Sequence, residues 1–257
     1  LLYTHWLQDH LYATPGLSEA ERRRGAFWMR TVLNALAPTN FLLTNPVALQ
    51  KLAATRGESL RRGMELFLQD LRDGDISMTD KRPFKVGENL GTTPGQVVFR
   101  NRLLEVIQYT PTTDKVQAVP VVIVAPWINK YYILDLTAKK SLVKWLTDQG
   151  FSVFITSWKN PDAQMSAVTF DDYVVDGIDQ IVKVAGSVCK SKQVNLVGYC
   201  LGGTGVAIYM AWLAKKFTRP ADMPVASWTL LTTLTDFDKA GDIEVFIDEG
   251  GLQAMGQ

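Results

Sequence analysis

The stretch QVNLVGYCLGG, residues 193–203, decides how the chain is expected to fold. Its apolar first half indicates a buried strand, and the small residues that follow indicate the start of a helix. Gly198 lets the strand end abruptly, and Gly202 lets the helix pack close to it. Cys200 stands between them, at the position of a nucleophile where serine is usual. The pattern G-x-C-x-G therefore predicts a strained strand-to-helix corner that exposes a thiol above a sheet.

A thiol at this corner has the surroundings that a nucleophile needs. The positive end of the helix dipole favours the thiolate of Cys200. The backbone N–H of Leu201 is expected to face an oxyanion, and a second N–H is expected from the loop after an earlier strand. The segment APWINKYYILDL, residues 125–136, is that loop. Trp127, Ile128 and Asn129 are the neighbouring candidates for the second donor, and we select Ile128.

Each residue singled out has a plainer interpretation. Cys200 is alternatively a small buried residue after a strand, but the strand, the glycine-rich helix start and the upstream loop together favour the nucleophile. Cys189, near the end of a helix, lacks this context and is expected to be structural. His5 and His10 are a candidate metal pair without a third ligand nearby, so a surface or core role is favoured. We therefore expect no metal and no cofactor.

The rest of the chain predicts an α/β fold with a mostly parallel sheet of the α/β-hydrolase type. Apolar runs of the kind that is buried on both faces alternate with helical stretches, which implies parallel strands with right-handed crossovers. One amphipathic helix is expected within Asp171 to Val188, and a hairpin is expected around Asn101. About six strands are readable, fewer than such a core normally has, so the sheet is expected to be incomplete here. The buried strands are expected at residues 119–125, 151–157, 194–199 and 227–232.

A small helical domain, residues 1–83, is expected to precede the sheet. Ser18 and Glu21 form a capping box at the start of an amphipathic helix. Asn45 before Pro46 marks another helix start, and Gly74 ends a later run. The apolar stripe of that later run consists of Leu60, Met64, Phe67, Leu68 and Leu71. Residues 84–257 are expected to form the N-terminal half of a catalytic domain.

Composition excludes several classes of function. With 47% hydrophobic residues, 21% charged residues and a net charge of +1, the chain lacks the basic field that favours nucleic acid or anionic lipid. Its longest strongly apolar run, residues 119–128, is shorter than the roughly 18 to 20 residues of a transmembrane helix. Two cysteines are too few for a disulfide framework, so we expect a reducing compartment, the cytoplasm. Both ends of the chain look cut, so we expect sequence to be missing there.

The choice of sulfur over oxygen indicates the reaction. A thiolate that attacks a thioester forms another thioester, and the acyl group keeps its transfer potential for an alcohol acceptor. Cysteine therefore favours acyl transfer from an acyl-coenzyme A over hydrolysis. The reaction needs a histidine oriented by a carboxylate, and in this fold the histidine follows the nucleophile in the chain. Since no histidine follows Cys200, we expect the catalytic aspartate and histidine beyond residue 257.

Several longer strings closely resemble class I polyhydroxyalkanoate (PHA) synthases over essentially the whole chain. The strings are PWINKYYILDL, SWKNPD, FDDYVVDGI, VNLVGYCLGGT, LLTTLTDFDKAGDIEVFIDEGG and, nearer the N-terminus, APTNFLLTNPVALQKLAATRGESLRRGMELFLQDL. The resemblance stops short of the family's C-terminal half.

This resemblance implies polymerisation of (R)-3-hydroxyacyl-coenzyme A to polyester with release of coenzyme A. Cys200 corresponds to the acylated nucleophile, and the backbones of Leu201 and of the Trp127–Ile128 turn correspond to the oxyanion hole. Residues from about 233 resemble the start of the family's cap, a mobile insertion over the active site. The resemblance also implies that the N-terminal region takes part in dimerisation, in attachment to cytoplasmic PHA granules and in contact with granule-associated proteins.

Two other functions stay open at this point. One is an α/β-hydrolase that acts as a thioesterase or depolymerase, for which a free hydroxy acid would be the sole product. The other is a fragment without activity that serves as a dimerisation or granule-binding module. Release of coenzyme A together with growing polymer would distinguish the synthase from both.

Overall fold

The computed structural model describes residues 2–80, 82–238 and 241–255 of the chain. It contains two compact units, Leu1–Asp80 with Phe237–Gln257, and Lys81–Asp236. These units divide at residues 80/81 and 236/237, and the domain boundary expected between residues 83 and 84 stays a prediction. None of the helices in the described part of the chain combines the length and hydrophobicity that a bilayer span requires.

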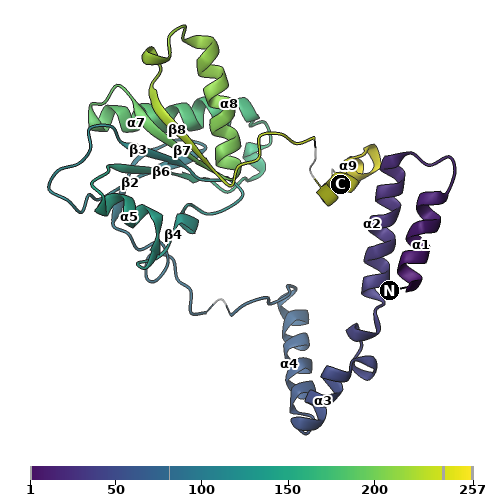
Figure 1. Cartoon of the computed structure of the whole chain (residues 1–257). Helices are drawn as coiled ribbons and strands as arrows, with labels where there is room; N and C mark the ends of the chain where they lie inside the picture. The colour runs from purple at the N-terminus through teal and green to yellow at the C-terminus, as the bar shows by residue number, and fades with distance from the viewer. Residues whose placement is uncertain (1, 81, 239–240, 256–257) are drawn as a thin grey trace. The chain divides into compact units, whose positions relative to one another are not determined.

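The second unit is built on a six-stranded sheet (Figure 1). The strand order is β1-β2-β6-β3-β7-β8. Strands β6, β3, β7 and β8 run parallel to one another, while β1 and β2 form the expected antiparallel hairpin at one edge. The bounds are β1 (Gly95–Arg100), β2 (Leu104–Tyr109), β3 (Val121–Val124), β6 (Val153–Trp158), β7 (Val194–Tyr199) and β8 (Val225–Leu231). A separate two-stranded sheet pairs β4 (Asp135–Thr137) with β5 (Lys140–Ser141).

Helices cover both faces of this sheet (Figure 1). Successive side chains of a strand point to opposite faces. Val122 and Val124 of β3 accordingly pack in a core with residues of α7 (Asp179–Cys189) and α8 (Leu201–Lys216). Val121 and Ile123 pack in a second core that includes Val143 of α5 (Leu142–Asp148). The mostly parallel α/β sheet predicted from the sequence is confirmed.

The expected burial of the last strand is wrong. Val225 of β8 is buried, but the four residues after it are exposed, and Trp228 is 47% exposed. In the described part of the chain β8 is one of the two edge strands of the large sheet and pairs only with β7. An apolar run therefore indicated a strand correctly, but it did not indicate how many layers would cover it.

The helix expected within residues 171–188 is interrupted. α6 (Phe170–Asp172) continues into a π-helix (Tyr173–Ile178) before α7 begins. A methyl group at Gly177 would lie 2.6 Å from the ring of Trp158, so this turn packs directly on that indole. The predicted apolar face is nevertheless buried or partly buried, and single π turns of this kind are frequent at functional sites.

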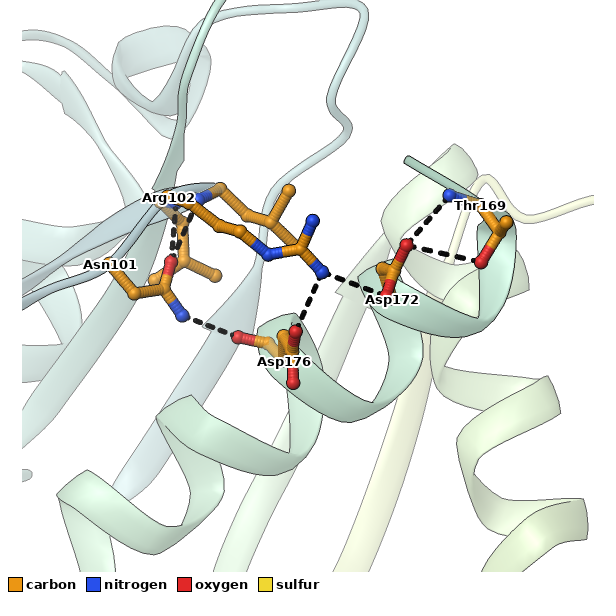
Figure 2. A network of polar contacts seen from close by, with 7 residues as sticks. Asn101, Arg102, Thr169, Asp172 and Asp176 are labelled. Atoms are coloured by element: carbon orange, nitrogen blue, oxygen red, sulfur yellow. Dashed lines mark hydrogen bonds and ion pairs between the residues drawn. The ribbon is translucent and has the colours of Figure 1, made fainter. Parts of the chain in front are cut away.

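The hairpin connection anchors this π-helix (Figure 2). Arg102 donates to Asp172 and to Asp176, each at 2.8 Å. Asn101 donates to the Asp176 carbonyl oxygen at 2.7 Å and accepts from the backbone N–H groups of residues 103 and 104. The Thr169 backbone N–H and, less strongly, Arg102 hold the pKa of Asp172 below its usual value. The loop between β1 and β2 therefore fixes one end of the segment that packs on Trp158.

The first unit consists of helices. They are α1 (Leu2–Ala13), α2 (Glu19–Ala35), α3 (Pro46–Ala54), α4 (Glu58–Asp73) and α9 (Glu249–Met255), with short 3-10 turns at Pro38–Asn40, Leu42–Thr44 and Gly241–Phe246. The capping box of Ser18 and Glu21 is confirmed, and Asn45 caps α3 as predicted. Gly74 ends α4 in the left-handed conformation. The apolar stripe predicted on α4 is 43–63% exposed: Leu60, Met64, Phe67, Leu68 and Leu71.

Residues of α2 contact the segment 241–255 through ion pairs and aromatic rings. Arg23 pairs with Glu244 and Arg30 with Asp242, each at 3.2 Å, and a third pair joins Arg24 and Asp248. The rings of Phe27 and Trp28 meet Phe246 edge to face, with centroids 5.4 and 5.8 Å apart. These contacts explain why residues after 236 group with the N-terminal helices.

Reversal of one of these ion pairs tests the packing of segment 241–255 on α2. Exposed ion pairs contribute about 0.2–1 kcal/mol, so Arg24→Glu is expected to raise the hydrogen-exchange rates of amides 241–253 by up to about fivefold. Asp248→Arg alone should do the same, and the double variant should recover part of the protection. High salt should lower protection in the parent and have less effect in Arg24→Glu. Unchanged exchange in both single variants would contradict this contact.

Candidate active site

Three strand ends meet at the carboxyl edge of the sheet. β3 and β7 pair in parallel up to Val124 and Gly198, and β7 and β8 pair in parallel up to Tyr199 and Leu231. The loop after β3, the turn at Cys200 and the segment after β8 therefore start side by side. Ligands of open α/β sheets bind at this edge.

Cys200 has the strained conformation that the sequence predicts for a nucleophile corner. It is the single residue between β7 and α8, with φ 55° and ψ −124°. A residue other than glycine rarely adopts a positive φ, and strain of this kind clusters at active sites. Its N–H donates to the Leu231 carbonyl at 3.0 Å, and its carbonyl accepts from Gly203 at 2.9 Å and from Thr204 at 3.2 Å. Cys200 is half-buried, so it is not sealed in the core. It precedes the first residue of α8, so it does not lie inside a helix.

The two glycines predicted to shape the corner lie in contact with backbone. A methyl group at Gly198 would lie 2.4 Å from the Cα of Gly203, and one at Gly202 would lie 2.1 Å from the carbonyl oxygen of Val124. Contacts that short do not occur between real atoms. The first turn of α8 therefore reaches its position against β3 only because these two residues have no side chain.

The backbone N–H groups expected at an oxyanion belong to the first residue of α8 and to the loop after β3. Leu201 is the first residue of α8, so its N–H has no carbonyl partner within the helix. Residues 126–129 form a turn in which the Asn129 N–H donates to the Pro126 carbonyl at 3.3 Å. That bond occupies Asn129, so Trp127 and Ile128 stay as candidates for the second donor. The Ile128 side chain is 75% exposed.

The start of this loop is held by groups that the sequence analysis did not identify. Trp158 donates from its indole N–H to the Ala125 carbonyl at 2.6 Å, and the Ala125 N–H donates to the buried Thr156 hydroxyl at 2.9 Å. The Trp127 ring packs against Phe170 and Tyr173, with centroids 5.6 and 5.4 Å apart. The tryptophan of SWKNPD was a visible signal, but its partner lies 33 residues away, and no local pattern indicates it.

The remaining candidates of the sequence analysis are Cys189, His5 and His10, and all three lie on helices. Cys189 is the last residue of α7, where burial raises the pKa of its thiol more than a contact with Ser152 lowers it. His5 and His10 are exposed residues of α1. Among the described residues, no group of three or more histidine, cysteine or acidic side chains is placed to hold a metal. Asp135 is buried, and its carboxylate accepts hydrogen bonds from both the N–H and the hydroxyl of Thr93, so these bonds hold it within the fold.

Fold and site together define a class. Counted along the chain, the strands of the large sheet lie in the order 1-2-4-3-5-6, and the fifth strand turns into a helix through a strained cysteine. This is the α/β-hydrolase arrangement, and Cys200 stands at the corner where the sequence predicts a nucleophile. Residues 1–146 match the protein family described as "Poly-beta-hydroxybutyrate polymerase (PhaC) N-terminus", so the chain belongs to that family. The resemblance to PHA synthases is thereby confirmed.

Similar curated proteins carry the corresponding name. The chain is 40% identical over 99% of its length to "Poly(3-hydroxyalkanoate) polymerase" of Methylorubrum extorquens, of which it covers 42%. It is 45% identical over 90% of its length to "Poly(3-hydroxyalkanoate) polymerase subunit PhaC" of Cupriavidus necator, of which it covers 39%. The chain thus spans about two fifths of the length of these relatives.

Two of the solved structures that resemble the chain are α/β hydrolases by title. One is "an alpha/beta hydrolase enzyme from the metagenome of sediments from the lagoon of Mar Chica, Morocco", 10% identical with a TM-score of 0.40 over 63% of each chain. Another is "a member of a/b serine hydrolase without lid" from Xanthomonas campestris, 16% identical with a TM-score of 0.38 over 63% of this chain and 78% of that one. At these scores the resemblance carries no conclusion about function.

A side chain at residue 202 should separate α8 from β3. Gly202→Ala places a methyl group against the main-chain carbonyl of Val124, so we expect a loss of about 1–3 kcal/mol in the free energy of unfolding of the sheet unit. The measurement is urea denaturation followed by hydrogen exchange of β3 and β7 amides. Gly63→Ala is the control, because a methyl group there meets nothing within 4 Å. Equal effects of the two substitutions would be incompatible with the close contact.

The two thiols should differ in reactivity. Burial raises the pKa of the Cys189 thiol and so disfavours its thiolate, whereas Cys200 is the residue directly before α8 at the strained corner. We expect iodoacetamide to modify Cys200 faster at neutral pH, by roughly threefold or more. Peptide mass spectrometry of timed samples gives both rates in one protein. Equal rates would argue against an activated corner.

Proposed function

We propose that this chain is the N-terminal region and the first half of the catalytic domain of a polyester synthase. The enzyme polymerises (R)-3-hydroxyacyl-coenzyme A into polyhydroxyalkanoate and releases coenzyme A. The observation that carries this proposal is the strained thiol at the strand-to-helix corner of a chain that belongs to the polymerase family. The names of the relatives support the substrate class, since both are called poly(3-hydroxyalkanoate) polymerases.

The proposed chemistry has two acyl transfers at Cys200. Its thiolate attacks the carbonyl carbon of the acyl-coenzyme A, the C–S bond to coenzyme A breaks, and coenzyme A leaves as a thiol after it takes up a proton. The hydroxyl oxygen of another hydroxyacyl group then attacks the acyl-cysteine carbonyl. An ester bond forms, the C–S bond to Cys200 breaks, and the hydroxyl proton returns to a base. No cofactor is needed, because the thioester supplies the acyl transfer potential.

Backbone donors are proposed to stabilise both tetrahedral intermediates. We assign this role to the N–H groups of Leu201, the first residue of α8, and of Ile128, in the loop after β3. The indole of Trp158 and the hydroxyl of Thr156 support this loop through Ala125. We propose that the histidine and the aspartate of the mechanism lie beyond residue 257, since no histidine follows Cys200 in the sequence and the chain covers about two fifths of its polymerase relatives.

The exposed stripe of α4 supports a binding role for the first unit. Five large apolar side chains along one helix are 43–63% exposed, which is typical of a surface that meets a partner. We propose that this stripe contributes to homodimer formation or to attachment at the polymer granule, with granule-associated proteins as further partners. A cytoplasmic, granule-associated location is part of the same proposal.

Removal of the thiol tests the synthase directly. Cys200→Ala in the native protein should abolish release of coenzyme A, because no other described residue takes the place of the nucleophile at the corner. Cys189→Ala is the matched control and should retain turnover. Free thiol is measured with a chromogenic disulfide, and the product is analysed by chromatography. Retained turnover in Cys200→Ala would remove this assignment, and a free hydroxy acid as sole product would favour the thioesterase.

A further inference from the structure

The segment after β8 is bonded to the nucleophile corner at two points. Leu231, the last residue of β8, accepts from the N–H of Cys200 at 3.0 Å. Three residues further on, the Leu234 carbonyl accepts from the hydroxyl of Thr204 at 2.7 Å. Thr204 in turn donates its own N–H to the Cys200 carbonyl at 3.2 Å. Cys200, Leu231, Leu234 and Thr204 therefore form a closed ring of hydrogen bonds and main chain.

Two residues of this ring have a strained backbone conformation. Cys200 has φ 55°, and Thr232, the residue directly after β8, has φ 46°. A β-branched residue with a positive φ is a conformational outlier, and strained residues persist only where their surroundings hold them. Two neighbouring strand ends thus each carry a residue that would relax if it were released.

Close packing accounts for only part of the contact between α8 and the segment after β8. A methyl group at Gly203 would lie 1.9 Å from the hydroxyl oxygen of Thr233, so the segment after β8 lies directly on the first turn of α8. The Thr233 hydroxyl donates to the Leu231 carbonyl at 3.1 Å, which is a bond within the segment itself. Thr204 supplies a side-chain bond from α8 to this segment, and it lies one helical turn after the nucleophile.

We propose that Thr204 is a positioning residue that holds Cys200 in its reactive conformation, an inference that rests on the proposed function. Its N–H binds the nucleophile's own carbonyl, while its hydroxyl ties the same turn to the segment after β8. Loss of the hydroxyl frees the Leu234 carbonyl to bind water at this partly exposed position. The effect on overall stability is therefore small, and the effect on the corner is larger.

Thiol reactivity tests this role without any acyl substrate. In the native protein, Thr204→Val keeps the shape of the side chain and removes the donor. We expect the ratio of iodoacetamide rates at Cys200 and Cys189 to fall about three- to tenfold, the value of one hydrogen bond. Thr204→Ser keeps the donor and should stay within about twofold of the parent. Thr229→Val, the same change at an exposed residue of β8, is the control and should leave the ratio unchanged.

The outcomes separate positioning from simple stability. If Thr204→Val does not fold, Thr204→Ala removes the same donor with a better helix former and gives the answer. An unchanged ratio in the variants without the hydroxyl, or an equal fall in Thr204→Ser, overturns the proposal. With (R)-3-hydroxyacyl-coenzyme A as substrate, kcat of Thr204→Val should fall by the same factor as the ratio of iodoacetamide rates, while KM stays the same. Absence of coenzyme A release in the parent would refute the proposed function, and the thiol ratio would still decide the role of Thr204.

Discussion

The contact between the first turn of α8 and the end of β3 is the constraint on which the rest of the site depends. Gly202 lies so close to the Val124 carbonyl that any side chain would force the helix away. Gly198 permits the same approach from the strand side. With both glycines in place, the chain must reverse within a single residue, and Cys200 takes up the positive φ that this requires. The half-buried thiol at the corner and the N–H of Leu201, which has no partner within the helix, both follow from that geometry.

Supports for this corner come from distant parts of the sheet unit. Trp158 binds the Ala125 carbonyl at the end of β3, and its ring also packs on Gly177 of the π-helix. The hairpin loop holds that π-helix through Arg102 and its two aspartates (Figure 2). A chain of contacts thus runs from the edge hairpin to the loop proposed to hold the oxyanion. On the other side, the segment after β8 closes the ring of hydrogen bonds through Thr204.

Local patterns predicted those features that depend on neighbours in sequence. The capping box of Ser18, the parallel strands and the corner at Cys200 each follow from residues within a few positions of one another. The exposure of β8 could not be predicted, because an apolar run reports a strand but not its covering layers. The π-helix and the bond of Trp158 to Ala125 arise from packing between segments far apart in the chain. The pairing of α2 with residues 241–255 joins residues 212 and 221 positions apart, which no periodicity reveals.

The central claim is that the thiol of Cys200 carries the acyl group between donor and acceptor. The most direct measurement is peptide mapping of the native protein after brief incubation with (R)-3-hydroxyacyl-coenzyme A and an acid quench. We expect a hydroxyacyl mass increment on the peptide that contains Cys200 and none on the peptide that contains Cys189. An increment on any other residue, with unmodified Cys200 during active turnover, would contradict the proposed role of the corner.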